Sequence, residues 1–248
     1  PSRQREPLGQ EEMGLIEFGL NMTAKAKRRG TNLLLFVVLI VTLVGSVGLI
    51  ALHFQTATQP IVGPPPADFP SGLTPDGYPY KGNPQAKVVI EEFADFQCPY
   101  CGRYAVEVAP KLDEKYVKTG QVYVVFRYFP FIGPESFRAA EAAACSAESG
   151  KFWEYQYVVF ANQRGENRGW FSSDRLAEFA RLVGLDVGGF QGCLGSGKYA
   201  RFIQASAEQA RKRGIRSTPT VVINGRTFEG LYDFATYDRY IGQLLGSG

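Results

Sequence analysis

Two cysteines separated by two residues carry the strongest chemical signal in this 248-residue sequence, as Cys98-Pro99-Tyr100-Cys101. Thiol–disulfide exchange requires two thiols that can form a disulfide, one of them activated and the other able to resolve a mixed disulfide. A two-residue spacer at the start of a helix meets both requirements, because the N–H groups and dipole of the helix N-terminus stabilise the Cys98 thiolate. Pro99 suits the first helical turn, where its missing N–H has no partner to lose. The motif therefore predicts a redox-active dithiol.

Half of a zinc site or a plain structural disulfide would use the same spacing. Zinc requires about four ligands, and Cys145, Cys193 and His53 provide no second pair at ligand spacing. His53 is the one histidine of the sequence and lies at the edge of a hydrophobic run. The folded domain therefore cannot assemble a Ser–His–Asp triad, a Cys–His pair or a histidine-rich metal site. We expect no metal ion, and no cofactor beyond the Cys98–Cys101 disulfide.

A second candidate for the site is the proline of Ser217-Thr218-Pro219-Thr220, which directly precedes an apolar strand. Such a proline can be an ordinary loop residue, because only about 5% of X–Pro bonds are cis. Together with the dithiol motif and a hairpin signal downstream, however, it predicts a cis bond that faces the dithiol. A cis Pro219 would turn the preceding backbone outward, so that Thr218 could pair with an extended substrate strand. We expect Pro99, Tyr100 and Thr218 to contact the substrate.

The dithiol requires a strand before it and a helix after it, and the sequence predicts both. Residues 88–96 form an apolar run rich in β-branched and aromatic residues, which indicates a buried central strand. Residues 103–117 have apolar residues at helical spacing, and we expect a kink at Pro110 because proline removes a backbone hydrogen bond. A second strand is predicted at 121–129.

The rest of the domain is predicted to be mostly helical. Residues 135–214, approximately, contain several segments with helical apolar spacing. Asn224-Gly225 is a strong hairpin signal between the short strands 220–223 and 227–229. An amphipathic helix at 233–245 closes the domain. The predicted fold class is therefore α/β, with a helical block inserted between the second strand and the hairpin.

An uncharged apolar stretch at 33–54 is long enough to cross a bilayer, because about 20 apolar residues span the hydrocarbon core as a helix. A secretory signal peptide usually has an apolar region of only about 7–15 residues, so a transmembrane helix is favoured. The basic residues within 25–29 precede the stretch, which predicts a cytoplasmic N-terminus and an extracytoplasmic location for all that follows. Small residues within 42–46 could pack against another membrane helix, which would allow a membrane complex.

These signals divide the chain into four parts. Residues 1–32 are predicted to be a cytoplasmic arm, either disordered or folded as an amphipathic helix on the membrane surface. Residues 33–54 are the predicted transmembrane helix. Residues 55–84 are rich in proline and glycine and lack sustained periodicity, which indicates an extended linker. Residues 85–248 are the predicted catalytic domain.

Charge excludes one large class of partners. The net charge is +3, with acids and bases interspersed through most of the chain. Nucleic-acid-binding proteins instead concentrate lysine and arginine on one face or arm. We therefore expect no nucleic-acid partner.

The remaining cysteines, Cys145 and Cys193, lie in the helical block. They could be two small buried residues, since a free cysteine often behaves as one. They could also form a structural disulfide that joins two helices, which an oxidising compartment favours. We predict the disulfide, which would stabilise the domain by constraining its unfolded chain.

Three segments together resemble the DsbA-like thioredoxin domains of bacterial envelopes: VIEEFADFQCPYCGRYA, the helical KFWEY, and GIRSTPTVVINGR. The resemblance covers about residues 80–246 and implies a thioredoxin fold with an all-helical insertion. Cys98 and Pro219 are 121 positions apart (219 − 98), which is more than a bare thioredoxin fold absorbs. The resemblance also implies that Glu92 is a buried acid that moves protons during exchange, a role that suits a carboxyl group with a raised pKa. The neighbouring Glu91 is the alternative.

The sequence departs from the best-known family pattern at Tyr100, where strong oxidants carry histidine. A nearby imidazolium lowers the pKa of the thiol, whereas tyrosine offers only a hydrogen bond. We therefore expect a milder oxidant than the histidine-bearing enzymes. Thr218 before the proline is similar to isomerase-type members, so the sequence does not separate oxidase from isomerase activity.

The leading hypothesis is a membrane-anchored thiol–disulfide oxidoreductase that introduces or exchanges disulfides in exported proteins. The family resemblance implies a quinone-linked membrane partner that re-oxidises the dithiol. Two alternatives remain open. One is an accessory or assembly subunit of a larger membrane complex, in which the domain serves for docking. The other is an envelope thiol reductant for cytochrome or cofactor maturation.

Overall fold

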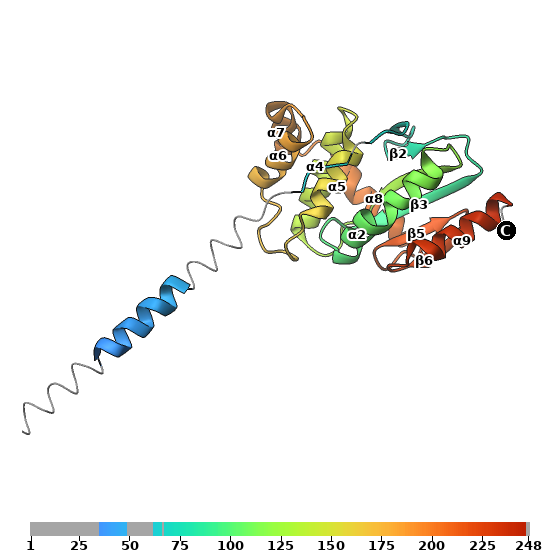
Figure 1. Ribbon diagram of the computed structural model, residues 1–248. Helices are drawn as coiled ribbons and strands as arrows, with labels where there is room; N and C mark the ends of the chain where they lie inside the picture. The colour runs from blue at the N-terminus through green and yellow to red at the C-terminus, as the bar shows by residue number, and fades with distance from the viewer. Residues whose placement is uncertain (1–34, 49–61, 66, 247–248) are drawn as a thin grey trace, which may run out of the picture. The chain divides into compact units, whose positions relative to one another are not determined.

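The computed structural model describes residues 35–48, 62–65 and 67–246 of the chain. The chain divides into two units, Pro1–Pro60 and Ile61–Gly248. Figure 1 shows both units, and each is described by itself below.

In the first unit, residues 35–48 form a helix whose residues are all exposed. Among the described residues, no helix combines the length and the apolar character that a membrane crossing requires. The predicted transmembrane helix at 33–54 extends past the described residues at both ends, and the predicted arm at 1–32 lies outside them.

The second unit is built on a six-stranded sheet in the order β1-β2-β4-β3-β5-β6 (Figure 1). The strands are β1 Ser71–Leu73, β2 Pro79–Gly82, β3 Val88–Ala94, β4 Val122–Tyr128, β5 Thr220–Ile223 and β6 Arg226–Glu229. β3 pairs with β4 in parallel, and the other neighbouring strands pair antiparallel. A parallel pair requires a crossover connection. The helical segment after the dithiol provides it, because it connects β3 to β4 along the chain, as the sequence predicts. The α/β fold class is confirmed.

The predicted linker at 55–84 is wrong in its second half, because β1 and β2 belong to the sheet. Strands of three and four residues are too short to show an alternating pattern in the sequence. Proline stands at the first position of β2, where a strand tolerates a missing N–H. The chain already contacts the domain at Val62, whose N–H donates to Asn162 Oδ1 (2.8 Å) and whose carbonyl accepts from Asn162 Nδ2 (2.9 Å). The folded unit thus begins well before residue 85.

The helical segment after the dithiol changes its hydrogen-bond pattern where proline interrupts it. It consists of α2 Pro99–Arg103, the π-helical η1 Tyr104–Val108, α3 Ala109–Leu112 and the π-helical η2 Asp113–Val117. The N–H of Ala109 bonds to the carbonyl of Tyr104, five residues earlier. Pro110 has no N–H to donate, and π-helical turns lie on both sides of the short helix that contains it. The kink expected at Pro110 stays a prediction.

The predicted helical insertion is confirmed. It comprises α4 Pro134–Ala147, α5 Phe152–Ala161, α6 Ser173–Leu182, α7 Val187–Gly195 and α8 Ala200–Lys212. Asn224 and Gly225 connect β5 to β6 with positive φ values of 44° and 86°, as a two-residue type I′ hairpin turn requires. The last helix, α9 Phe234–Leu245, begins after Asp233, whose side chain accepts from Thr236 N–H.

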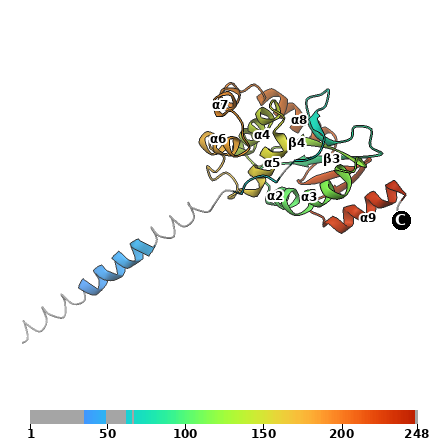
Figure 2. The ribbon, with the colours of Figure 1, turned by 45° about the horizontal axis from the view of Figure 1, so that its top comes forward.

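The two faces of the sheet have different covers. Figure 2 shows α2, α3 and α9 on one side of β3 and β4, and α8 on the other. Residues alternate along β3, so Ile90 belongs to the large core cluster that also contains Tyr104 and Tyr237. Phe93 belongs to a smaller cluster with Ala207 and other residues near α8. This alternation decides the surroundings of each acid on β3.

Candidate active site

The dithiol lies where β3 leads into α2. Cys98 is the N-cap of α2, with extended backbone angles, and its N–H donates to the carbonyl of Asp95 at 3.0 Å. Its own carbonyl accepts from the N–H of Gly102 at 3.1 Å, the first hydrogen bond of the helix. Both cysteines are free thiols in this structure. Cys98 is 5% exposed beside the exposed Pro99 and Tyr100, whereas Cys101 is fully buried.

The surroundings of Cys98 favour its thiolate. A hydrogen bond from the Cys101 thiol is the largest cause that lowers the pKa of Cys98 from 9.0 to about 6, against the opposing effect of burial. The N–H groups of Cys101 and Tyr100 lower this pKa further. These two N–H groups belong to the first turn of α2, which otherwise leaves them without helical acceptors. A substantial fraction of Cys98 is therefore ionised at neutral pH.

Cys101 behaves in the opposite way. Burial raises the pKa of its thiol well above the ordinary value of 9.0, and the neighbouring Cys98 raises this pKa further. The pair is therefore asymmetric, with one nucleophilic thiolate that is still 5% exposed and one protonated thiol that is fully buried. Exchange chemistry requires this division into an attacking and a resolving sulfur.

The Thr218-Pro219 segment lies against the dithiol. The bond between these residues is cis, and Cys98 Sγ lies 3.3 Å from the Thr218 carbonyl oxygen. The carbonyl of Pro219 accepts from Gly230 N–H at 2.8 Å, which ties this segment to the end of the hairpin. The structure thus brings Cys98, Cys101, Thr218 and Pro219 together across 120 positions of sequence.

The two neighbouring acids on β3 have opposite environments. Glu92 is 1% exposed, and its Oε1 has no hydrogen-bond partner within the described part of the chain. Burial raises the pKa of Glu92 to about 7. The charge of Lys81 opposes this rise, and the charge of Asp113 adds to it. Glu91 instead forms ion pairs with two arginines on the α8 side of the sheet, at 127 and 213. Of the two acids, Glu92 is therefore the one whose carboxyl group is buried and whose pKa is raised.

A buried ion pair near Glu92 was not predicted from the sequence. Lys81 Nζ lies 2.7 Å from Asp113 Oδ2, and the two side chains are only 5% and 15% exposed. The lysine also lies over the Trp153 ring, 4.3 Å from its centroid. Because Lys81 falls in the stretch assigned to a linker, no sequence pattern marked it as buried.

Asp95 is a further residue that the sequence did not single out. It is 1% exposed, and its carboxylate accepts hydrogen bonds from the N–H groups of Gln97, Phe131 and Ile132 at 2.8–3.0 Å. These bonds hold the turn before Cys98 against the loop after β4. The one sequence feature that could have pointed to Asp95 is its position three residues before Cys98.

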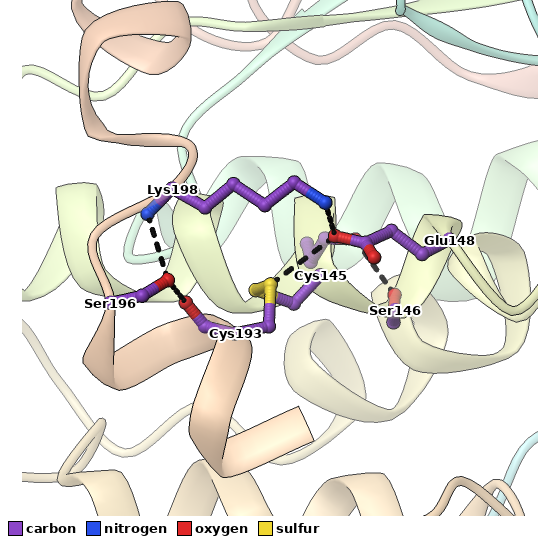
Figure 3. The surroundings of a disulfide bond; sticks show 7 residues. Cys145, Ser146, Glu148, Cys193, Ser196 and Lys198 are labelled. Carbon is purple, nitrogen blue, oxygen red and sulfur yellow. Dashed lines mark hydrogen bonds and ion pairs between the residues drawn. A yellow bond between two sulfur atoms is a disulfide. The ribbon is translucent and has the colours of Figure 1, made fainter. Parts of the chain in front are cut away.

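The second pair of cysteines forms a disulfide away from the sheet (Figure 3). Cys145 on α4 and Cys193 on α7 are joined with an S–S distance of 2.07 Å and a Cα–Cα distance of 6.0 Å. An ion pair between Glu148 and Lys198 (2.9 Å) lies beside it. Among the described residues, no group of three His, Cys, Asp or Glu side chains is placed to hold a metal ion.

Comparison with known proteins decides the family. The family model described as thioredoxin matches residues 75–243. The chain belongs to the thioredoxin family. It is 32% identical over 148 residues to the probable disulfide bond formation protein D of Bacillus cereus, covering 58% of this chain and 68% of that one. It is also 34% identical over 163 residues to the Na⁺/H⁺ antiporter NhaA 3 of Salinispora tropica, but this region is only 24% of that protein.

The solved structures agree with this assignment. BdbD from Bacillus subtilis in its oxidised form superposes with a TM-score of 0.65 at 23% identity, covering 72% of this chain and 99% of that one. This likeness shows the fold, including the helical insertion. Taken with the Bacillus cereus relative, it shows that the thioredoxin-family chain is a DsbA-like thiol–disulfide oxidoreductase.

Proposed function

We propose that this DsbA-like oxidoreductase exchanges disulfides with exported proteins through Cys98 and Cys101. The observation that carries the proposal is the Cys98 thiol at the start of α2, with a pKa of about 6 and a distance of 3.3 Å to the Thr218 carbonyl. A thiolate of low pKa is both available at neutral pH and a good leaving group.

In the oxidising direction, a substrate thiolate attacks Cys98 Sγ of the Cys98–Cys101 disulfide. The S–S bond breaks, and Cys101 leaves as a thiolate that takes up a proton. A second substrate thiolate then attacks the substrate sulfur of the mixed disulfide and releases Cys98 as a thiolate. Two electrons pass from the substrate to the enzyme, and the substrate gains one disulfide. In the reverse direction Cys98 attacks a substrate disulfide and Cys101 resolves the intermediate.

Glu92 is proposed to supply and receive the proton of Cys101. The buried Cys101 thiolate is unfavourable, so its formation and loss require a nearby acid–base group. A carboxyl group with a pKa of about 7 is suited to this task at neutral pH. The neighbouring Glu91 is committed to its arginine partners, which leaves Glu92 as the proton carrier.

The substrate is proposed to bind along the surface around the dithiol. Tyr100 is 56% exposed and Pro99 is exposed beside Cys98, whereas Thr218 and Pro219 lie buried against it. An extended substrate segment can pair its backbone with Thr218 while its cysteine reaches Cys98. Tyr100 offers no positive charge to the thiolate, and a pKa of about 6 agrees with a milder oxidant than the histidine-bearing enzymes.

A membrane anchor is proposed from the apolar stretch at 33–54. The basic residues before it favour a cytoplasmic N-terminus and an extracytoplasmic catalytic domain. The contacts at Val62 and strands β1 and β2 shorten the proposed linker to about residues 55–61. A quinone-linked membrane protein is the proposed re-oxidising partner. Extraction of the protein from isolated membranes only by detergent, and not by high salt or alkaline buffer, tests the anchor.

The decisive test of the activity uses a reduced, unfolded test protein and the full chain. Cys98→Ser should abolish disulfide formation in the test protein. Cys101→Ser, mixed instead with a test protein that still carries its disulfides, should trap a mixed disulfide that is visible on a non-reducing gel, because Cys98 attacks and no second thiol resolves the intermediate. Unchanged turnover by Cys98→Ser would overturn the proposal. The reduction potential then separates an oxidase from an envelope reductant, because the two roles require opposite redox poise.

A further inference from the structure

The side chain of Gln163 joins the helical insertion to the turn that carries Cys98. Gln163 follows α5 directly, two residues after its end. Its Nε2 donates to two backbone carbonyls, that of Phe96 at 2.7 Å and that of Cys98 at 3.0 Å. A single carboxamide therefore bridges the carbonyls on both sides of Gln97, the residue before the dithiol.

Gly102 makes room for this carboxamide. A Cβ atom at position 102 would lie 2.4 Å from Gln163 Oε1, closer than real Cβ atoms approach. Gly102 continues directly from Cys101 inside α2, where glycine weakens a helix relative to alanine. Glycine at position 102 therefore leaves the space that the Gln163 side chain occupies.

A second glutamine, which lies within the turn itself, also joins the turn to the insertion. Gln97 is 2% exposed, and its Nε2 donates to Ser136 Oγ at 2.8 Å. Its Oε1 accepts from the N–H of Asn167, which belongs to the same loop of the insertion as Gln163. The loop after α5 therefore contacts the turn at three successive residues, 96, 97 and 98.

We infer that Gln163 is a positioning residue for the redox-active dithiol. Cys98 is the N-cap of α2, and its carbonyl accepts both from Gly102 N–H within the helix and from Gln163 Nε2 outside it. These two donors fix the Cys98 carbonyl at the first turn of α2. The N–H groups of Tyr100 and Cys101 then stay directed at the thiolate. The inference rests on the proposed function, because it concerns the reactivity of the same cysteine.

The test compares Gln163→Leu with Gln156→Leu in the full chain. Gln156 is a buried glutamine two helical turns earlier on α5, and it lines a cavity of about 240 Å³ with Lys81 and Trp153. The first readout is the pH dependence of iodoacetamide alkylation of Cys98, followed by mass spectrometry. The second is the equilibrium of the dithiol with glutathione. Neither readout requires turnover of a protein substrate.

Gln163→Leu should lower the acid dissociation constant of Cys98 by about threefold to tenfold, the effect of one lost hydrogen bond. The glutathione equilibrium should shift toward the oxidised dithiol by the same factor, because the reduced form loses thiolate stabilisation. Gln156→Leu should change both by less than about twofold. If Gln163→Leu and Gln156→Leu lower the melting temperature alike and leave both readouts unchanged, Gln163 has only a structural role and the inference is overturned.

A double-mutant cycle gives a second, independent measurement. Gly102→Ala should displace the carboxamide and reproduce the effect of Gln163→Ala on the Cys98 dissociation constant. In the Gln163→Ala background, Gly102→Ala should add less than about twofold, since the side chain it displaces is gone. Additive effects of the two substitutions would contradict the inference. A failure of the proposed function is a separate outcome: Cys98→Ser would then keep its turnover, independently of the result of the double-mutant cycle.

Discussion

The burial of Glu92 predicts that Glu92→Gln makes the protein more stable at neutral and alkaline pH. The pKa of Glu92 is about 7 in the folded chain, against an ordinary value of 4.5. An acid whose pKa is raised by folding binds more protons when folded, so stability is highest below about pH 4.5 and falls as the pH rises through 7. The difference (7 − 4.5) corresponds to about 3 kcal/mol of lost stability above pH 7.

Glutamine has the shape of the protonated carboxyl group but cannot ionise. The free energy of unfolding of Glu92→Gln should therefore equal that of the wild type near pH 4.5, and exceed it by up to about 3 kcal/mol at pH 8. Urea unfolding at both pH values measures this difference. The dithiol should be reduced and the Cys145–Cys193 disulfide intact, which mass spectrometry can verify.

The same variant should lose activity while it gains stability. If Glu92 carries the proton of Cys101, the rate at which glutathione disulfide oxidises the wild-type dithiol should show an inflection near pH 7. Glu92→Gln should be slower and lack this inflection. A residue with only a structural role would not couple a gain in stability to a change in the pH profile.

Glu91 is the matched control, one position away. Burial raises the pKa of Glu91, but the hydrogen bond from Arg213 and the charge of Arg127 outweigh it, so the pKa is lowered overall. The stability that Glu91 contributes is present above the unfolded pKa and lost as the pH falls through the folded pKa. Glu91→Gln should therefore destabilise the protein at pH 8. A stability gain for Glu92→Gln that is the same at pH 4.5 and pH 8 would refute the reasoning.

Three further predictions follow from the site and its supports. Tyr100→His should lower the pKa of Cys98 and shift the glutathione equilibrium toward the reduced dithiol, because an imidazolium stabilises the thiolate; an unchanged equilibrium would contradict this. Replacing Cys145 and Cys193 by alanine should lower the free energy of unfolding by about 4 kcal/mol for a sequence separation of 48, measured by urea unfolding; a loss below about 1 kcal/mol would oppose it. Lys81→Met should cost about 3–5 kcal/mol, since it leaves a buried carboxylate unpaired; pairing it with Asn at position 113 should recover part of that loss.

The dithiol and the fold around it were predictable because their signals are local. The CxxC motif follows an apolar run, and the Asn224-Gly225 turn requires positive φ values that few other pairs adopt. The long separation between Cys98 and Pro219 predicted the helical insertion. For the dithiol and the hairpin, a short stretch of sequence contains the physical reason for the structure.

The residues that the sequence did not reveal depend on contacts between distant segments. β1 and β2 are too short to show periodicity, and the proline-rich composition around them is typical of linkers, although a strand tolerates proline at its first position. Lys81 is buried because Asp113 and Trp153 surround it, which no pattern near residue 81 indicates. Gln163 acts on carbonyls 67 and 65 positions away. Such contacts are specified by the packing of the insertion against the sheet.

The most direct test of the account is the pH dependence of alkylation in the reduced protein, with the modified cysteine identified by mass spectrometry. We expect Cys98 alone to react at neutral pH, with an inflection near pH 6, while Cys101 stays unmodified. Equal modification of both cysteines, or an inflection of Cys98 near pH 9, would contradict it.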